Sequence, residues 1–181
     1  MTTFIHPFTF GDRTQSDLLG GKGANLAEMV KIGLPVPPGF TITTEACREF
    51  LVNEKIPEAL PAQLEAALAN LEKELGKEFG NPAKPLLVSV RSGAKFSMPG
   101  MMETVLNVGM TPEVAQAMGE QSGNPKFAWD CYRRFVDMYG RIVCDVPNEE
   151  FHKIAARVLA QFKAKSIADL DVDGLKALLG S

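Results

Sequence analysis

The sequence predicts an α+β protein in which a part of mixed strands and helices is followed by an all-helical part. Two runs rich in valine, leucine and threonine have the composition of strands. We expect Leu86–Val90 to form a single buried strand, and Thr104–Val108 to form a second strand. After Gly109 the remaining patterns are helical, and prolines stand at their starts. We therefore expect an α/β part over residues 1–110 and a helical subdomain, incomplete at its C-terminal end, over residues 111–181.

The first part opens with an extended segment. Phe4, Phe8 and Phe10 recur at even spacing, which predicts a strand with one buried face. Pro7 places this strand at the edge of a sheet, because proline has no N–H to donate. A second short strand is predicted over Phe40–Thr43 from its β-branched content.

Helical periodicity predicts three helices in the same part. The first runs from about Ala24 to Ile32 and is stopped by Gly33. The second begins at Glu45, with Thr43 or Thr44 as its N-cap. The third presents one stripe of leucines that we expect to face the core: Leu60, Leu64, Leu68, Leu71 and Leu75.

The helical subdomain begins with a short helix over Pro112–Met118. Asn124 is a suitable N-cap for the next helix, with Pro125 at its first position. Pro147 breaks that helix, and a further one is expected over about Asn148–Lys163.

Near the C-terminus, Asp169–Gly174 resembles the opening of an EF-hand calcium loop. The twelfth position of such a loop would be Gly180, which cannot supply the bidentate glutamate that calcium needs. We therefore assign no metal ligand and expect Asp171 or Asp173 to cap a terminal helix over Gly174–Leu179.

Composition excludes several classes of function. The net charge of -3 and the pI of about 5.5 argue against a nucleic-acid partner. The three widely spaced cysteines indicate reduced thiols, and the absence of a long apolar run or a leader predicts no membrane association and a cytoplasmic protein. His6 and His152 have no carboxylate or cysteine partner at catalytic spacing, so no catalytic residue is assigned.

One candidate binding element combines glycines with a cation. Gly20, Gly21 and Gly23 surround Lys22 immediately before the first predicted helix. Backbone N–H groups, a positive helix end and an ammonium would then share a small volume, as phosphate binding requires. The spacing is not that of a Walker A loop. A tight glycine turn with a solvated lysine is the alternative.

A second candidate element follows the predicted strand that ends at Arg91. Small and flexible residues come next, among them Ser92, Ser97 and Gly100, before the chain returns at Thr104. An arginine at the edge of such a loop suits an anionic ligand approached by backbone groups. The alternative is a surface arginine at a hairpin, but the presence of two cationic, glycine-containing loops favours the anion site.

Three motifs carry a family resemblance, namely LGGKGANLAEM at Leu19–Met29, GLPVPPGFTITTEAC at Gly33–Cys47, and LVSVRSG followed by SMPGMMET between Leu87 and Thr104. Together they resemble the pyruvate, phosphate dikinase family over residues 10 to about 158. The resemblance implies the front half of an ATP-grasp nucleotide-binding domain. Lys95 and Phe96 depart from the Arg-Ala usual there, although the positive charge is kept.

The resemblance also implies roles for individual residues. Lys22 and Arg91 would bind the triphosphate of ATP, under a loop that contributes Gly100, Met101, Met102 and Thr104. The supporting residues would be Gly20, Gly21, Gly23, Ser92, Lys95 and Ser97.

For the complete enzyme the resemblance implies a reaction that converts ATP, pyruvate and phosphate to AMP, phosphoenolpyruvate and diphosphate through a phosphohistidine. ATP and Mg²⁺ would be its cofactors, and a homodimer its assembly. The central histidine domain, the pyruvate and phosphoenolpyruvate barrel and the acidic magnesium ligands would all lie beyond Ser181. We therefore expect the chain alone to be inactive and to bind ATP weakly. The alternatives are a phosphoenolpyruvate synthase-like fragment and a short non-catalytic paralogue that serves as an interaction module.

Overall fold

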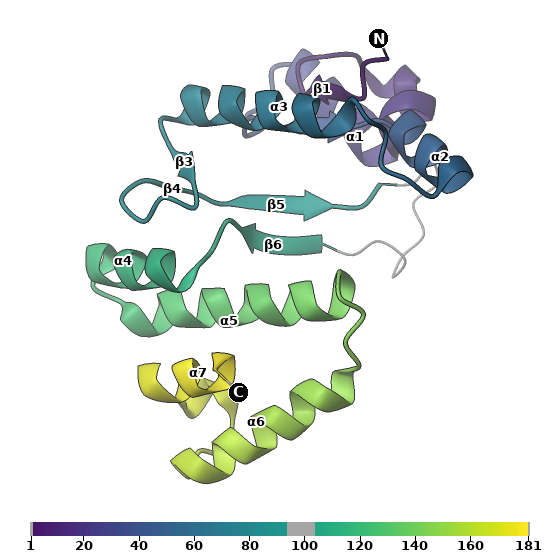
Figure 1. Cartoon of the computed structure of the whole chain (residues 1–181). Helices are drawn as coiled ribbons and strands as arrows, with labels where there is room; N and C mark the ends of the chain where they lie inside the picture. The colour runs from purple at the N-terminus through teal and green to yellow at the C-terminus, as the bar shows by residue number, and fades with distance from the viewer. Residues whose placement is uncertain (1, 94–103, 181) are drawn as a thin grey trace. The chain divides into compact units, whose positions relative to one another are not determined.

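The computed structural model describes residues 2–93 and 104–180, which form α-helices and short two-stranded sheets (Figure 1). The predicted α+β class is therefore confirmed. Contacts divide these residues into two compact units, one of residues 2–76, 92 and 93 and the other of residues 77–91 and 104–180. The second unit thus contains strands as well as helices, whereas the sequence groups residues 77–110 with the N-terminal part.

In the first unit, β1 (Ile5–Pro7) pairs antiparallel with β2 (Phe40–Ile42). Both predicted strands are present, but β1 is shorter than the phenylalanine pattern suggests. The chain turns after Pro7, where the N–H of Phe10 donates to the Pro7 oxygen. Phe10 then stacks on His6 with ring centroids 3.9 Å apart, so it does not share the buried position of Phe4.

The first long helix begins earlier than the sequence predicts. After the 3-10 turn η1 (Arg13–Gln15), α1 runs over Ser16–Lys31 and includes the glycines that were expected to precede it. Its predicted end is confirmed. Gly33 has φ 81°, and its N–H and that of the next residue donate to the oxygens of Val30 and Met29, which is a Schellman motif.

Helix α2 (Thr44–Asn53) has Thr43 at its N-cap, as predicted, but the Thr43 side chain makes no capping bond. Its hydroxyl is buried and has no hydrogen-bond partner among the described residues. Thr44 instead bonds to the backbone of α1. Neither threonine side chain therefore caps α2, and the Thr44 side chain joins α2 to α1.

Helix α3 (Leu60–Leu75) carries the predicted leucine stripe, but the expectation that the whole stripe faces the core is wrong. Leu71 is buried, whereas Leu64 and Leu75 are each 39% exposed. The reason is that α3 packs against β1, a strand of three residues, which is too short to cover a stripe of four helical turns.

In the second unit, β3 (Glu78–Phe79) pairs parallel with β4 (Pro85–Leu86), and β5 (Val88–Arg91) pairs antiparallel with β6 (Thr104–Val108). The predicted single buried strand over Leu86–Val90 is wrong. Leu86 is buried in β4, but Val90 on β5 is 54% exposed. Among the described residues β5 pairs only with β6, and a two-stranded ribbon does not bury both of its faces.

The helices of this unit are α4 (Pro112–Ser122), α5 (Pro125–Ile142), α6 (Asn148–Phe162), the 3-10 turn η2 (Ile167–Asp169) and α7 (Val172–Leu179). The predicted caps are present. Asn124 accepts from the N–H of Phe127 at 3.1 Å, and Asp171 accepts from the N–H of Gly174 at 2.9 Å. Helix α4 extends beyond its predicted end at Met118.

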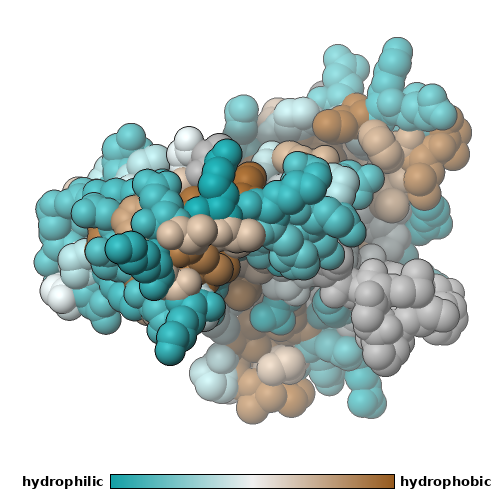
Figure 2. Space-filling model, turned by 90° about the horizontal axis from the view of Figure 1, so that it is seen from below, coloured by the Kyte–Doolittle hydropathy of each residue, from teal (hydrophilic) through white to brown (hydrophobic). Residues whose placement is uncertain are grey.

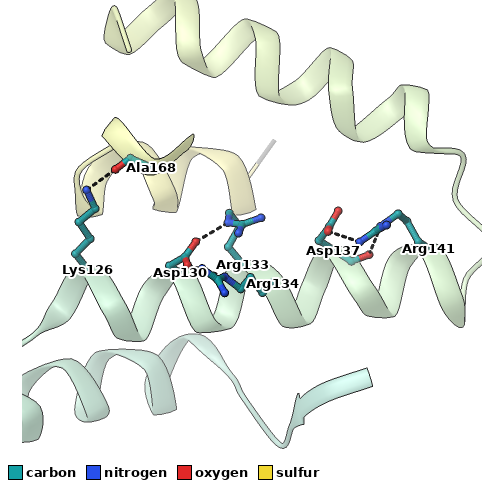
Figure 3. Close-up of polar contacts among 7 residues, drawn as sticks. All are labelled: Lys126, Asp130, Arg133, Arg134, Asp137, Arg141 and Ala168. Carbon is teal, nitrogen blue, oxygen red and sulfur yellow. Dashed lines mark hydrogen bonds and ion pairs between the residues drawn. The ribbon is translucent and has the colours of Figure 1, made fainter. Parts of the chain in front are cut away.

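The core of the second unit lies where α4, α5, α6 and α7 meet, around Val114, Trp129, Val158 and Leu175. Polar contacts along α5 supplement it (Figure 3). Lys126 donates to the Ala168 oxygen at 2.7 Å, and Asp130 accepts from both Arg133 and Arg134. Farther along the helix, Arg141 pairs with Asp137 at 2.6 Å.

Large apolar side chains also remain exposed in both units. Brown surface of this kind interrupts the hydrophilic surface on the face that Figure 2 displays. The most exposed include Val52 at 81%, Leu51 at 70% and Ile56 at 64%.

Candidate functional site

The backbone of α1 is interrupted at Gly20. This residue has φ 68° and ψ 165°, a conformation open essentially only to glycine, so α1 consists of two helical pieces joined at Gly20. The second piece begins at Gly21. The first N–H groups of a helical piece have no partner within it, which leaves those of Gly21, Lys22 and Gly23 to bind other acceptors. The positive end of a helix dipole therefore lies in the middle of α1.

Lys22 is held in place by a residue far away in the sequence. Its Nζ donates to the backbone oxygen of Ser92 at 3.0 Å. A Cβ atom added to Gly20 would lie 3.9 Å from the carbonyl carbon of Gly93, so this second segment also lies close to the break. Within the first unit, Gly20, Lys22, Ser92 and Gly93 thus form one cluster.

Gly23 has a packing role in addition to its place beside Lys22. It is buried, and a Cβ atom there would lie 2.8 Å from both Cγ2 and Oγ1 of Thr41 on β2. Only glycine lets α1 approach the strand this closely. The glycines accordingly belong to a broken helix packed on a sheet, rather than to a tight turn.

Arg91 and Thr104 are neighbours in the second unit. Arg91 is the last residue of β5 and is exposed, and its partner in the strand register is Thr104, the first residue of β6. No carboxylate of the described residues lies within ion-pair distance of Arg91. Among residues 2–93 and 104–180, an anion at its guanidinium would therefore displace no carboxylate partner.

Five of the predicted site residues lie outside the described residues: Lys95, Ser97, Gly100, Met101 and Met102.

Burial shifts the pKa of titratable side chains among the described residues, including His6 and Cys131. Burial lowers the pKa of His6, against an opposing effect of Glu45, so the imidazole is neutral near pH 7. Burial also raises the pKa of the Cys131 thiol, which disfavours the reactive thiolate. Within residues 2–93 and 104–180, no group of three or more histidines, cysteines and acids is arranged to hold a metal ion. Helices in the same ranges all lack the length and hydrophobicity to cross a membrane.

Comparison with known proteins identifies the family. The family model described as "Pyruvate phosphate dikinase, AMP/ATP-binding domain" matches residues 16–60 and 56–123, which together are more than half of the chain. The chain belongs to this family. The matched region contains the broken start of α1 and the β5–β6 ribbon, so both candidate elements lie inside the dikinase nucleotide-binding domain.

Individual dikinases are similar over nearly the whole chain. Pyruvate, phosphate dikinase of Clostridium symbiosum is 45% identical over 179 residues, which are 98% of this chain and 20% of that protein. Pyruvate, phosphate dikinase 2 of Oryza sativa is 47% identical over 93% of this chain, and the Rhizobium meliloti dikinase is 50% identical over 85% of it. The chain spans about a fifth of the length of these relatives.

Sequence reasoning missed two features of the dikinase cluster around Lys22. The acceptor for Lys22 is a backbone oxygen, and every residue has one, so the sequence carries no signal for it. It also missed Thr44 and Arg48 of α2, which bind the backbone of α1 just before the break. The Gly-Gly pair at Gly20 was the available signal for the interruption of the helix.

Proposed function

We propose that this chain supplies part of the ATP-binding site of a pyruvate, phosphate dikinase, in which Lys22 and Arg91 each bind triphosphate oxygens. The observation that carries the proposal is the position of Lys22 at the start of a helical piece, directly after the glycine break. Membership of the AMP/ATP-binding domain family supports adenine nucleotide as the ligand.

In this proposal Lys22 and Arg91 neutralise the charge of the triphosphate and hold it in position. Phosphoryl transfer needs little covalent chemistry from the protein, and cations with backbone donors provide most of the stabilisation. Lys22 acts as a point charge beside the first N–H groups of a helical piece, and Arg91 offers a planar fork of donors. Thr104, beside Arg91 in the register, adds a hydroxyl that is able to donate to a phosphate oxygen.

The proposed enzyme uses ATP, pyruvate and phosphate and releases AMP, phosphoenolpyruvate and diphosphate. One phosphoryl group of ATP passes to phosphate and the other to pyruvate, through a histidine carried on another domain. Mg²⁺ would reduce the charge of the triphosphate, and the acids that hold it are expected elsewhere in the enzyme. Among the residues that the structure describes, no group of three or more histidines, cysteines and acids could hold a metal ion. A homodimer, a cytoplasmic location and the ATP-grasp fold remain predictions.

The test uses the dikinase polypeptide that carries residues 1–181. Lys22→Ala and Arg91→Ala are each expected to slow pyrophosphoryl transfer from ATP by about 10²-fold or more, as loss of a charge-stabilising donor does elsewhere. Matched controls are Lys165→Ala and Arg157→Ala, which remove exposed cations from the helical part. Unchanged rates of pyrophosphoryl transfer in both Lys22→Ala and Arg91→Ala would contradict the assignment of these residues to the ATP-binding site.

The 181-residue chain provides a second test. We expect titration calorimetry with Mg-ATP to show no micromolar binding, because two cations and a short run of N–H groups are few partners for a triphosphate. Micromolar affinity would mean that this chain contains a complete site.

A further inference from the structure

Helix α2 holds the chain just before the break in α1. Thr44 Oγ1 donates to the backbone oxygen of Asp17, and Arg48 Nη2 lies 3.4 Å from the same oxygen. Arg48 Nη2 also donates to Thr44 Oγ1 at 3.0 Å. The two side chains are one helical turn apart on α2, so they converge on a single carbonyl of α1.

That carbonyl lies three residues before the break at Gly20. In a regular helix the Asp17 oxygen would accept from the N–H of Gly21, four residues ahead. The non-helical dihedral angles of Gly20 lie between the two groups and turn the chain off the helical path. Thr44 and Arg48 therefore bind the backbone of α1 three residues before it leaves the helical path.

We propose that Thr44 and Arg48 are positioning residues for the nucleotide site. By fixing the Asp17 carbonyl they fix where the second helical piece begins, and so where Lys22 and its neighbouring N–H groups point. Neither residue needs to contact ATP. The inference rests on the proposed function of Lys22, but its structural half is testable without nucleotide.

The structural half is measured by amide hydrogen exchange on the 181-residue chain. Thr44→Val and Arg48→Met are expected to speed exchange at residues 25–27, just after the break, by about fivefold, the scale of one lost hydrogen bond. Exchange at residues 67–71 of α3 should not change, and Thr44→Ser should restore the wild-type rates. Unchanged exchange at residues 25–27 in both variants overturns the proposal.

The functional half is measured in the dikinase polypeptide. Both variants should raise KM for ATP by about three- to tenfold while leaving KM for pyruvate unchanged, with rescue by Thr44→Ser and no effect of Arg157→Met. A rise in Arg48→Met without one in Thr44→Val would mean that Arg48 binds ATP directly, which overturns the positioning role. Faster exchange with an unchanged KM for ATP overturns it as well.

The outcomes separate this inference from the proposed function. If Lys22→Ala leaves pyrophosphoryl transfer unchanged, the assignment of Lys22 fails while the exchange result still describes the α2 contact. If Lys22→Ala abolishes transfer but neither α2 variant alters KM for ATP, the ATP site stands and the positioning role fails.

Discussion

The ammonium of Lys22 donates to the backbone oxygen of Ser92, 70 positions later in the chain, over 3.0 Å. This bond uses one of three N–H donors on the ammonium, and the other two have no acceptor among the described residues and could donate to phosphate oxygens. A lysine is a flexible side chain whose ordering on ligand binding has an entropic cost. The contact with Ser92 orders Lys22 in advance, which lowers that cost for an incoming anion.

Replacement of Lys22 should separate function from stability. Because the bond to Ser92 lies at the surface, Lys22→Met is expected to change the free energy of unfolding by less than about 1 kcal/mol. Urea denaturation of the 181-residue chain measures this, and Lys165→Met is the control. A much larger loss would mean that Lys22 has a structural role, and reduced pyrophosphoryl transfer in its variants would need reinterpretation.

Gly20→Ala should destabilise the protein through its backbone alone. At φ 68° and ψ 165° an alanine is strained by about 1–3 kcal/mol, although its Cβ would meet no atom closer than 3.9 Å. The measurement is the free energy of unfolding, compared with Asn25→Ala on the exposed side of the same helix, which should stay within about 0.5 kcal/mol. Equal free energies of unfolding for Gly20→Ala and Asn25→Ala would contradict the glycine-only backbone conformation at Gly20.

Local rules predicted those ends of helices that a glycine or a capping side chain marks better than they predicted burial. The stop at Gly33 and the caps at Asn124 and Asp171 depend on a few neighbouring residues, so the sequence contains the whole signal. The exposure of Val90 and of the α3 leucines depends on which other elements cover them. Periodicity identifies an apolar face but says nothing about the size of its partner.

In the candidate site, too, the sequence predicts the residues but not the contacts that hold them in place. Glycines around Lys22 and an arginine at a strand end were visible in the sequence, and the structure places Arg91 beside Thr104 in the register. The contacts of Lys22 with Ser92, and of Thr44 and Arg48 with Asp17, use backbone oxygens. Such partners are set by the tertiary fold, which no local pattern encodes.

Gly23 and Thr41 should be energetically coupled. An alanine Cβ at Gly23 would lie 2.8 Å from two atoms of Thr41, so Gly23→Ala is expected to lower the free energy of unfolding by about 1–3 kcal/mol. In a Thr41→Ala background those atoms are gone and only the contact with Leu19 Cβ at 3.3 Å remains, so the same change should lower the free energy of unfolding by less than about 1 kcal/mol. A double-mutant cycle measures the coupling. Simple additivity would mean that Gly23 does not set the approach of α1 to β2.

The ion pair between Asp12 and Lys31 predicts a pH-dependent contribution to stability. Asp12 Oδ2 lies 2.7 Å from Lys31 Nζ, and Oδ1 accepts from the backbone N–H of Thr14 at 2.9 Å. The bond with Lys31 and then those with Thr14 hold the pKa of the Asp12 carboxyl below its ordinary value. A carboxyl with a lowered folded-state pKa stabilises the fold above its unfolded pKa of about 3.9, and this contribution is lost as the pH falls toward the folded value.

Asp12→Asn tests this because it removes the charge and keeps the shape and the capping oxygen. The difference in Tm between wild type and variant should be small at pH 7, since the Lys31 side chain is 59% exposed and water screens the pair. It should narrow steadily as the pH is lowered below about 4. Lys31→Met should show the same narrowing, because it removes the other half of the pair. A Tm difference that stays constant from pH 7 to pH 3 would show that the charge of Asp12 does not stabilise the fold.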